Sequence, residues 1–150
     1  MSKLLNRVDA ELKIAKELNP IIAMGMLAVR KMIIEEGNSL DGYQRDAMRT
    51  VNKDTGTLIR LGNFALGISG EAGEVADYIK KILYHGHPMD KDKLCKELGD
   101  VLWYVATLAD TAGLTLEEVA RGNIVKLRKR YPDGFSQERS INRDDSEVSL

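Results

Sequence analysis

The stretch of sequence that decides the fold is residues 58–84, LIRLGNFALGISGEAGEVADYIKKILY. Its apolar residues recur three or four positions apart, which is the spacing of one face of an α-helix. They are Leu61, Ala65, Ile68, Ala72, Val75, Ala76, Ile79, Ile82 and Leu83. We therefore expect a long helix that buries this apolar stripe and ends at the His85-Gly86-His87-Pro88 segment.

Helical patterns also occupy most of the remaining chain. A second apolar stripe lies between Asp90, which suits an N-cap, and Gly113, and it comprises Leu94, Leu98, Val101, Leu102, Val105, Leu108 and Ala109. We expect further helices over residues 4–18, 21–36, 39–50 and 115–130, the last one beginning with a capping box of Thr115 and Glu118. Residues 137–150 are a polar tail that we expect to be mobile. The predicted fold class is all-α, a helical bundle.

Composition excludes several classes of function. The formal net charge is −1 over 150 residues, so no overall field favours nucleic acid or an anionic membrane. Cys95 is the single cysteine, which rules out an internal disulfide and favours a reducing cytoplasm. Residues 1–9 have no apolar continuation typical of a signal peptide, and the apolar stretch 20–34 is too short to span a bilayer.

Two short motifs carry the candidate chemistry, Glu71-Ala-Gly-Glu74 and Glu97-Leu-Gly-Asp100. Each places two carboxylates on one face of a helix. In both helices the acids lie roughly 80° and 140° from the centre of the apolar stripe, on the same rotational side. Since a short loop makes the two helices antiparallel neighbours, the acids point either towards each other or apart. If they converge, they require a cation, and oxygen ligands suit Mg²⁺ or Mn²⁺.

The alternative is that these four acids are ordinary solvated side chains, and the residues alone leave that choice open. A di-iron site is a poorer interpretation, because such sites in helical bundles use Glu-x-x-His pairs. Here the fourth position is an acid, and both histidines, His85 and His87, fall in a loop.

The helix expected over 115–130 carries a polar residue inside its apolar stripe. Asn123 lies among Leu116, Val119, Ala120 and Leu127, so we expect a buried amide that needs partners. Lys126 and Arg130 flank the same face. These three residues form either a wall for phosphates or a satisfied core amide with two cations reaching water.

Gly67, Gly70 and Gly73 interrupt the long helical pattern, each at a cost of about 1 kcal/mol relative to Ala. Close approach of another helix, from this chain or from a second subunit, explains them. A local break in the helix near Ser69-Gly70 is the alternative, and we prefer the first explanation.

Together these segments resemble the MazG-like nucleotide pyrophosphohydrolases. The resemblance covers roughly residues 40–136. It rests on GISGEAGEVAD at 67–77, the Lys80-Lys81 pair, ELGDVLWY at 97–104 and NIVKLRKRYPDGF at 123–135. It implies an all-α bundle in which Mg²⁺ is held by Glu71, Glu74, Glu97 and Asp100. The first Glu of the family pattern is Gly70 here, and Asp77 is the candidate to substitute for it.

The resemblance implies hydrolysis of nucleoside or deoxynucleoside triphosphates to a monophosphate and pyrophosphate. Glu74 is the candidate to orient the water, and Asn123, Lys126, Arg130 and Lys81 are the candidate substrate-binding residues. Two alternatives stay open: a nucleotide-sensing or partner-binding module without strong catalysis, and a phosphoribosyl-ATP pyrophosphohydrolase. The sequence does not identify the preferred nucleobase of the substrate. The candidates to stack on that base are Tyr43, Phe64, Trp103 and Tyr104.

The resemblance also divides the chain. Residues 39–136 are the expected catalytic helical domain, residues 1–38 an N-terminal helical hairpin for oligomerisation or partner binding, and residues 137–150 the tail. The glycine-rich face and the resemblance both favour a homodimer or homotetramer. We expect no nucleic-acid partner and no membrane.

Overall fold

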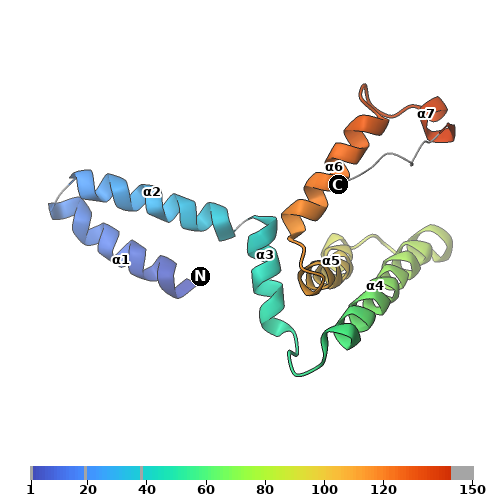
Figure 1. Ribbon diagram of the computed structural model, residues 1–150, viewed down its shortest axis with the longest axis horizontal. Coiled ribbons are helices and arrows are strands. Elements are labelled where there is room, and N and C mark those ends of the chain that lie inside the picture. The colour runs from blue at the N-terminus through green and yellow to red at the C-terminus, as the bar shows by residue number, and fades with distance from the viewer. Residues whose placement is uncertain (1, 19, 38, 143–150) are drawn as a thin grey trace.

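The computed structural model describes residues 2–18, 20–37 and 39–142, and within these ranges the protein is helical without strands (Figure 1). The prediction of an all-α fold is confirmed. The helices are α1 (Ser2–Leu18), α2 (Pro20–Gly37), α3 (Leu40–Ala47), the 3₁₀ helix η1 (Met48–Thr50), α4 (Thr57–His85), α5 (Lys91–Thr111), α6 (Leu116–Arg130) and α7 (Gln137–Ile141).

Capping residues set most of the helix boundaries. The Asp90 carboxylate accepts hydrogen bonds from the backbone N–H groups of Asp92 and Lys93 at the start of α5. At α6, the Thr115 hydroxyl accepts from the Glu118 N–H, and the Glu118 carboxylate accepts from the Thr115 N–H, which completes the predicted capping box. Gly86, at φ 71°, ends α4 in the left-handed conformation that glycine adopts without strain.

Helices α4 and α5 form the most extensive interface in the fold, and they run antiparallel. Near the connecting loop, the Tyr78 hydroxyl donates to the Asp90 carbonyl at 2.9 Å and accepts from the Asp90 N–H at 2.7 Å. At the far end, the Phe64 and Trp103 rings meet edge to face with centroids 5.8 Å apart. Between these two contacts, Glu71 faces Glu97 and Asp100.

A buried glutamine of α3 joins α3 to α5 and α6. The Gln44 amide nitrogen donates to the carbonyls of Ala106 and Leu114, and its oxygen accepts from the N–H of Leu116 at 2.8 Å. Asp41 accepts from the N–H of Glu117 one residue further along α6. The first turn of α6 is therefore held by α3, and in the view of Figure 1 the rest of α6 runs in a similar direction to α4 but apart from it.

The N-terminal helices form a hairpin with its own small apolar cluster. Leu12 and Ala15 of α1 pack with Ala23 and Met26 of α2, and Arg30 pairs with Asp9 at 2.6 Å. The hairpin reaches the remaining chain through contacts between α2 and α3. Figure 1 shows it projecting to the side opposite α4.

Three details differ from the sequence expectations. Part of the polar tail is ordered as α7, because Ser136 caps it by accepting from the Arg139 N–H; residues 143–150 lie outside the described residues. The apolar stripes of α4 and α5 are not fully buried, since Leu83 is 67% exposed and Leu98 51% exposed. Instead α4 buries Phe64 and Tyr78. Helix α4 continues through Ser69 and Gly70, so the alternative of a local break is wrong.

Candidate active site

Three of the four predicted carboxylates come together on the α4–α5 pair. One carboxylate oxygen from each of Glu71, Glu97 and Asp100 lies within 4.8 Å of the others. Glu71 and Glu97 are half-buried, whereas Asp100 is exposed. Phe64 and Tyr78, each seven residues or two helical turns from Glu71, turn this face of α4 towards α5. We call Glu71, Glu97 and Asp100 the carboxylate cluster.

The donor set of the carboxylate cluster suits a small hard cation. Within the described residues, none of the three acids forms an ion pair with a lysine or arginine. In an octahedral Mg²⁺ site, neighbouring oxygens are about 3.0 Å apart and opposite ones about 4.2 Å apart, so rotation of the carboxylate side chains by an ångström or two would bring the three oxygens to coordinating distance. A divalent cation would relieve the repulsion between the carboxylates.

Glu74 is exposed and does not join the carboxylate cluster. It lies one turn beyond Glu71, on the flank of α4 that also carries Lys81. The hydrogen bond that Lys81 donates to Asp77, and then the negative charges of Asp77 and Glu74, raise the pKa of Lys81. Asp77 is paired with both Lys80 and Lys81, the latter at 2.6 Å, and these contacts lower the pKa of Asp77 to about 2. Asp77 is therefore engaged with lysines and lies outside the carboxylate cluster.

Tyr43 of α3 lies beside the carboxylate cluster. Burial raises the pKa of Tyr43, and the negative charge of Asp100 raises it further. The ring packs against the apolar group of Ala47, Ala106 and Leu116. Helix α3 thus borders the cluster on the Asp100 side.

The structure does not bring the α6 residues against α4. Asn123 is exposed, so the expectation of a buried amide is wrong for this chain, while Lys126 and Arg130 are half-buried. Helix α6 packs on α3 and α5 rather than on α4. The apolar stripe of α6 is covered mainly at its first turn, where Leu116 is buried.

Gly67 lets α5 approach α4 closely. A Cβ atom built on Gly67 would lie 2.1 Å from the Tyr104 ring, so this position has no room for a side chain. A Cβ on Gly70 or Gly73 would meet no atom within 4 Å. The close approach of a helix is therefore confirmed at Gly67, and the other two glycines face open space in the single chain.

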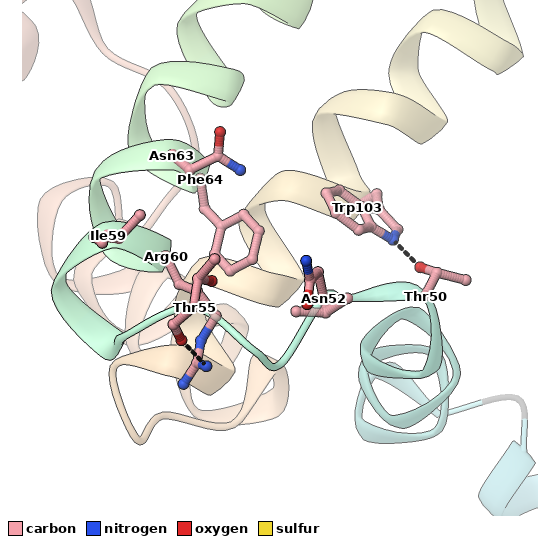
Figure 2. Close-up of a pocket in the computed structure, with 9 residues that line it drawn as sticks. Thr50, Asn52, Thr55, Ile59, Arg60, Asn63, Phe64 and Trp103 are labelled. Atoms are coloured by element: carbon pink, nitrogen blue, oxygen red, sulfur yellow. Dashed lines mark hydrogen bonds between the residues drawn. The ribbon is translucent and has the colours of Figure 1, made fainter.

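A cavity of about 450 Å³ lies where the segment after η1 meets α4 and α5 (Figure 2). Figure 2 shows Trp103 beside Thr50 on one side of the cavity and Ile59, Asn63 and Phe64 on the other, and Val51, Asn52, Thr55 and Arg60 complete the lining. The Trp103 indole N–H donates to the Thr50 hydroxyl at 2.9 Å. Arg60 fastens the loop by donating to the carbonyls of Lys53 and Thr55.

Sequence reasoning found the aromatic residues of this cavity but missed its polar ones. Phe64 and Trp103 line the cavity. Tyr104 covers Gly67 instead, and Tyr43 of α3 packs against the apolar group described above. Thr50, the last residue of η1, and Asn52, in the loop after it, were missed because a polar residue at a helix end or in a loop carries no periodic signal. Asn63 had a signal, since it lies four residues before Gly67 on the same flank of α4.

Comparison with known proteins assigns most of the helical region after η1 to one family. The MazG nucleotide pyrophosphohydrolase domain matches residues 62–135. The Gene 37 protein of Mycobacterium phage L5 is 38% identical over 94 residues, which cover 60% of this chain and 82% of that protein. The uncharacterized protein YvdC of Bacillus subtilis (strain 168) is 33% identical over 85 residues, covering 51% and 76%. No solved structure matches the chain.

The protein is thus an all-α protein whose carboxylate cluster is a candidate metal site. The chain belongs to the MazG nucleotide pyrophosphohydrolase family. Proteins of this family generally depend on a divalent metal. Among the described helices, none combines the length and the apolar character needed to cross a membrane.

Proposed function

We propose that this protein hydrolyses nucleoside or deoxynucleoside triphosphates to a monophosphate and pyrophosphate in the presence of Mg²⁺, with Mn²⁺ as a substitute. The observation that carries the proposal is the carboxylate cluster, three acids without cationic partners among the described residues. They lie within the segment that matches a pyrophosphohydrolase domain. This reaction would serve to control the nucleotide pool or to remove unwanted nucleotides from it.

Glu71, Glu97 and Asp100 would hold the metal, as the closeness of their oxygens supports. When bound, the ion supplies charge neutralisation for the phosphates. Glu74, adjacent but outside the cluster, is free to orient a water molecule and accept its proton. The water oxygen forms a bond to phosphorus as the bond to the bridging oxygen breaks, and pyrophosphate leaves with that electron pair. No nucleophilic side chain is required.

Cationic side chains would bind the phosphates. Lys81 is already oriented by its ion pair with Asp77, on the same helix as Glu71 and Glu74. The proposal for Asn123, Lys126 and Arg130 rests on the family resemblance, because α6 leaves the α4–α5 pair after its first turn. Lys126 and Arg130 nevertheless bring positive charge to a half-buried helix face.

We also propose a homodimer or homotetramer, located in the cytoplasm as the single cysteine favours. A second face of α4 and α5, rotated about each helix axis by roughly 100° from Glu71 and Glu97, carries exposed apolar side chains. They are Ala72, Ala76, Leu83, Leu98 and Leu102. We call them the apolar α4–α5 face. Because the two helices are antiparallel with offsets of the same sense, this face is continuous, and a second copy of the pair would cover it.

A substrate screen tests the proposed function. The purified full chain, with saturating Mg²⁺, would be assayed for pyrophosphate and for orthophosphate with canonical, deoxy and modified triphosphates and with phosphoribosyl-ATP. We expect Mg²⁺-dependent release of pyrophosphate alone. Preference for phosphoribosyl-ATP would favour the histidine-synthesis enzyme. Nucleotide binding without turnover of any compound would favour a sensing module, and release of orthophosphate alone would contradict the reaction.

A further inference from the structure

The cavity beside Trp103 and the carboxylate cluster lie on the same face of the α4–α5 pair. On α4, Phe64 in the cavity precedes Glu71 by two helical turns, so the two side chains share a face. On α5, Trp103 in the cavity follows Asp100 by three residues, which makes them surface neighbours. The antiparallel packing puts both pairs side by side. A ligand held at the cluster therefore has the cavity directly next to it.

One flank of α4 connects the two places. Residues on it alternate four and three positions apart, which is the spacing of a straight stripe along a helix. They are Asn63, Gly67, Gly70, Glu74, Asp77 and Lys81. At 1.5 Å per residue, Asn63 lies about 12 Å before Glu71 along the axis, and Lys81 about 15 Å beyond it. Gly70, with no atom within 4 Å of its Cβ position, leaves this flank open next to the acids, whereas Gly67 lies under the Tyr104 ring.

The cavity has the chemistry of a site for a flat heteroaromatic ring. Its apolar lining residues are Val51, Ile59, Phe64 and Trp103, and Figure 2 shows the carboxamides of Asn52 and Asn63 near the Phe64 and Trp103 rings. Within the described residues, the Asn63 carboxamide forms no hydrogen bond, so its donor and its acceptor are both available. A carboxamide pairs with the mixed donor–acceptor edge of a base. No acidic side chain lines the cavity.

The walls of the cavity are fixed before a ligand arrives. Trp103 is held by its bond to Thr50, and the Thr50 hydroxyl in turn donates to the Ala47 carbonyl at 2.8 Å. The Asn52 side chain accepts from the Asp54 N–H, and Arg60 holds the Thr55 carbonyl at 2.6 Å. A site of this kind binds without first ordering a loop.

We propose that this cavity receives the nucleobase of the substrate, with Asn63 contacting the base edge. The nucleotide then lies along α4, with its base near the N-terminal end and its terminal phosphates towards Lys81. This inference rests on the proposed function for the identity of the ligand. It adds a direction for the substrate and a residue for base selection.

The only tryptophan of the chain lies in the cavity, and this makes a direct test available. The fluorescence lifetime of Trp103, which base absorbance does not distort, would be followed as AMP, CMP, GMP, UMP and dTMP are added in the presence of Mg²⁺. Pyrophosphate, which has no base, is the parallel ligand. We expect a saturable lifetime change with at least one monophosphate and none with pyrophosphate.

The Asn63→Ala variant tests the contact with the base edge. Loss of one hydrogen bond should raise the dissociation constant of the preferred monophosphate about tenfold. The Asn6→Ala variant makes the same change on an exposed face of α1 and should leave that constant unchanged. An equal constant in the Asn63→Ala variant, checked for helicity by circular dichroism, would overturn the assignment of Asn63.

Failure of this inference is distinguishable from failure of the proposed function. If pyrophosphate is released from triphosphates while no monophosphate changes the Trp103 lifetime, the base lies elsewhere and the hydrolase remains. If the lifetime responds to bases while no triphosphate is hydrolysed, the base subsite stands and the hydrolase proposal falls.

Discussion

At the scale of single residues, the acids of the carboxylate cluster differ from several other acids of the described helices because they form no ion pair with a lysine or arginine. Asp77 and Asp9 are each paired with a basic side chain, whereas Glu71, Glu97 and Asp100 lie near one another and, among the described residues, form no ion pair. Like charges at this separation destabilise the fold unless a cation joins them. Substitutions should therefore affect activity and metal-free stability in opposite directions.

The first prediction concerns the cluster itself. Glu71→Gln, Glu97→Gln and Asp100→Asn should each lower Mg²⁺-dependent pyrophosphate release by roughly two orders of magnitude or more, because a neutral amide is a weaker ligand for a hard cation. In metal-free buffer each should melt at the same or a higher temperature. Glu11→Gln on exposed α1 is the matched control and should change neither property. Full activity in any two of the cluster variants would remove the assignment.

The second prediction concerns Asp77 and pH. Its pKa is lower in the folded protein, about 2, than the ordinary value of 3.8. The ion pairs with Lys80 and Lys81 therefore contribute stability that is complete above pH 3.8 and is lost as the pH falls towards 2. Asp77→Asn should melt below the parent at neutral pH, and the difference should vanish near pH 2. A carboxyl titration of Asp77 by NMR at its ordinary pKa would contradict this.

Residue patterns revealed the four acids but not which of them meet. The helical offsets are equal for the two motifs, yet only Glu71 of the α4 motif joins Glu97 and Asp100. Phe64 and Tyr78, which lay outside the expected apolar stripe, decide the rotation of α4 and leave Glu74 on its flank. The expected apolar stripe of α4 included several small alanines and left out Phe64 and Tyr78, although these large rings bury more surface and therefore fix the rotation of the helix.

At the scale of helices, the boundaries were the most predictable feature. Asp90, Thr115 and Gly86 mark helix ends through local hydrogen bonds and backbone preference, which the sequence displays directly. The role of Gln44 could not be predicted from the local sequence, because its hydrogen-bond partners are backbone groups 62 to 72 residues away. Contacts of that kind depend on how helices pack and have no local pattern.

The third prediction follows from the role of Gln44. Gln44→Ala leaves the Ala106 and Leu114 carbonyls and the Leu116 N–H without this partner, so the free energy of unfolding should fall by about 3 kcal/mol. Chemical denaturation measures this. Gln137→Ala, an exposed glutamine on α7, should cost much less. Equal losses in the two variants would mean that α3 does not anchor α6.

At the scale of the whole molecule, much apolar surface stays exposed. The hydrophobic periodicity of α4 and α5 predicted a buried stripe, but the single chain covers only part of it. Leu83, Leu98 and Leu102 remain 67%, 51% and 39% exposed. Hydrophobic periodicity indicates that a helix face is buried. It does not indicate whether the residues that bury this face belong to the same chain or to another copy.

The fourth prediction is the assembly itself. Light scattering at micromolar concentration should give a mass two or four times 16.7 kDa. Leu83→Glu and Leu102→Glu place charge on the apolar α4–α5 face and should shift the mass towards the monomer, because a charge buried in an interface is costly. Ile141→Glu, at an 81% exposed site on α7, is the control. A monomeric parent protein would rule out this role for the face.

The contact between Gly67 and Tyr104 has a consequence for ion size. Gly67 lies one turn before Glu71 on α4, and Tyr104 lies one turn after Asp100 on α5, so this contact sits beside the acids and sets the gap between the helices. A methyl group at residue 67 would push the helices apart and widen the space between the carboxylates. Calcium needs longer bonds to oxygen than magnesium, about 2.3–2.6 Å against 2.0–2.1 Å. If the carboxylate cluster holds the proposed ion, the absence of a side chain at Gly67 therefore favours magnesium over the larger calcium.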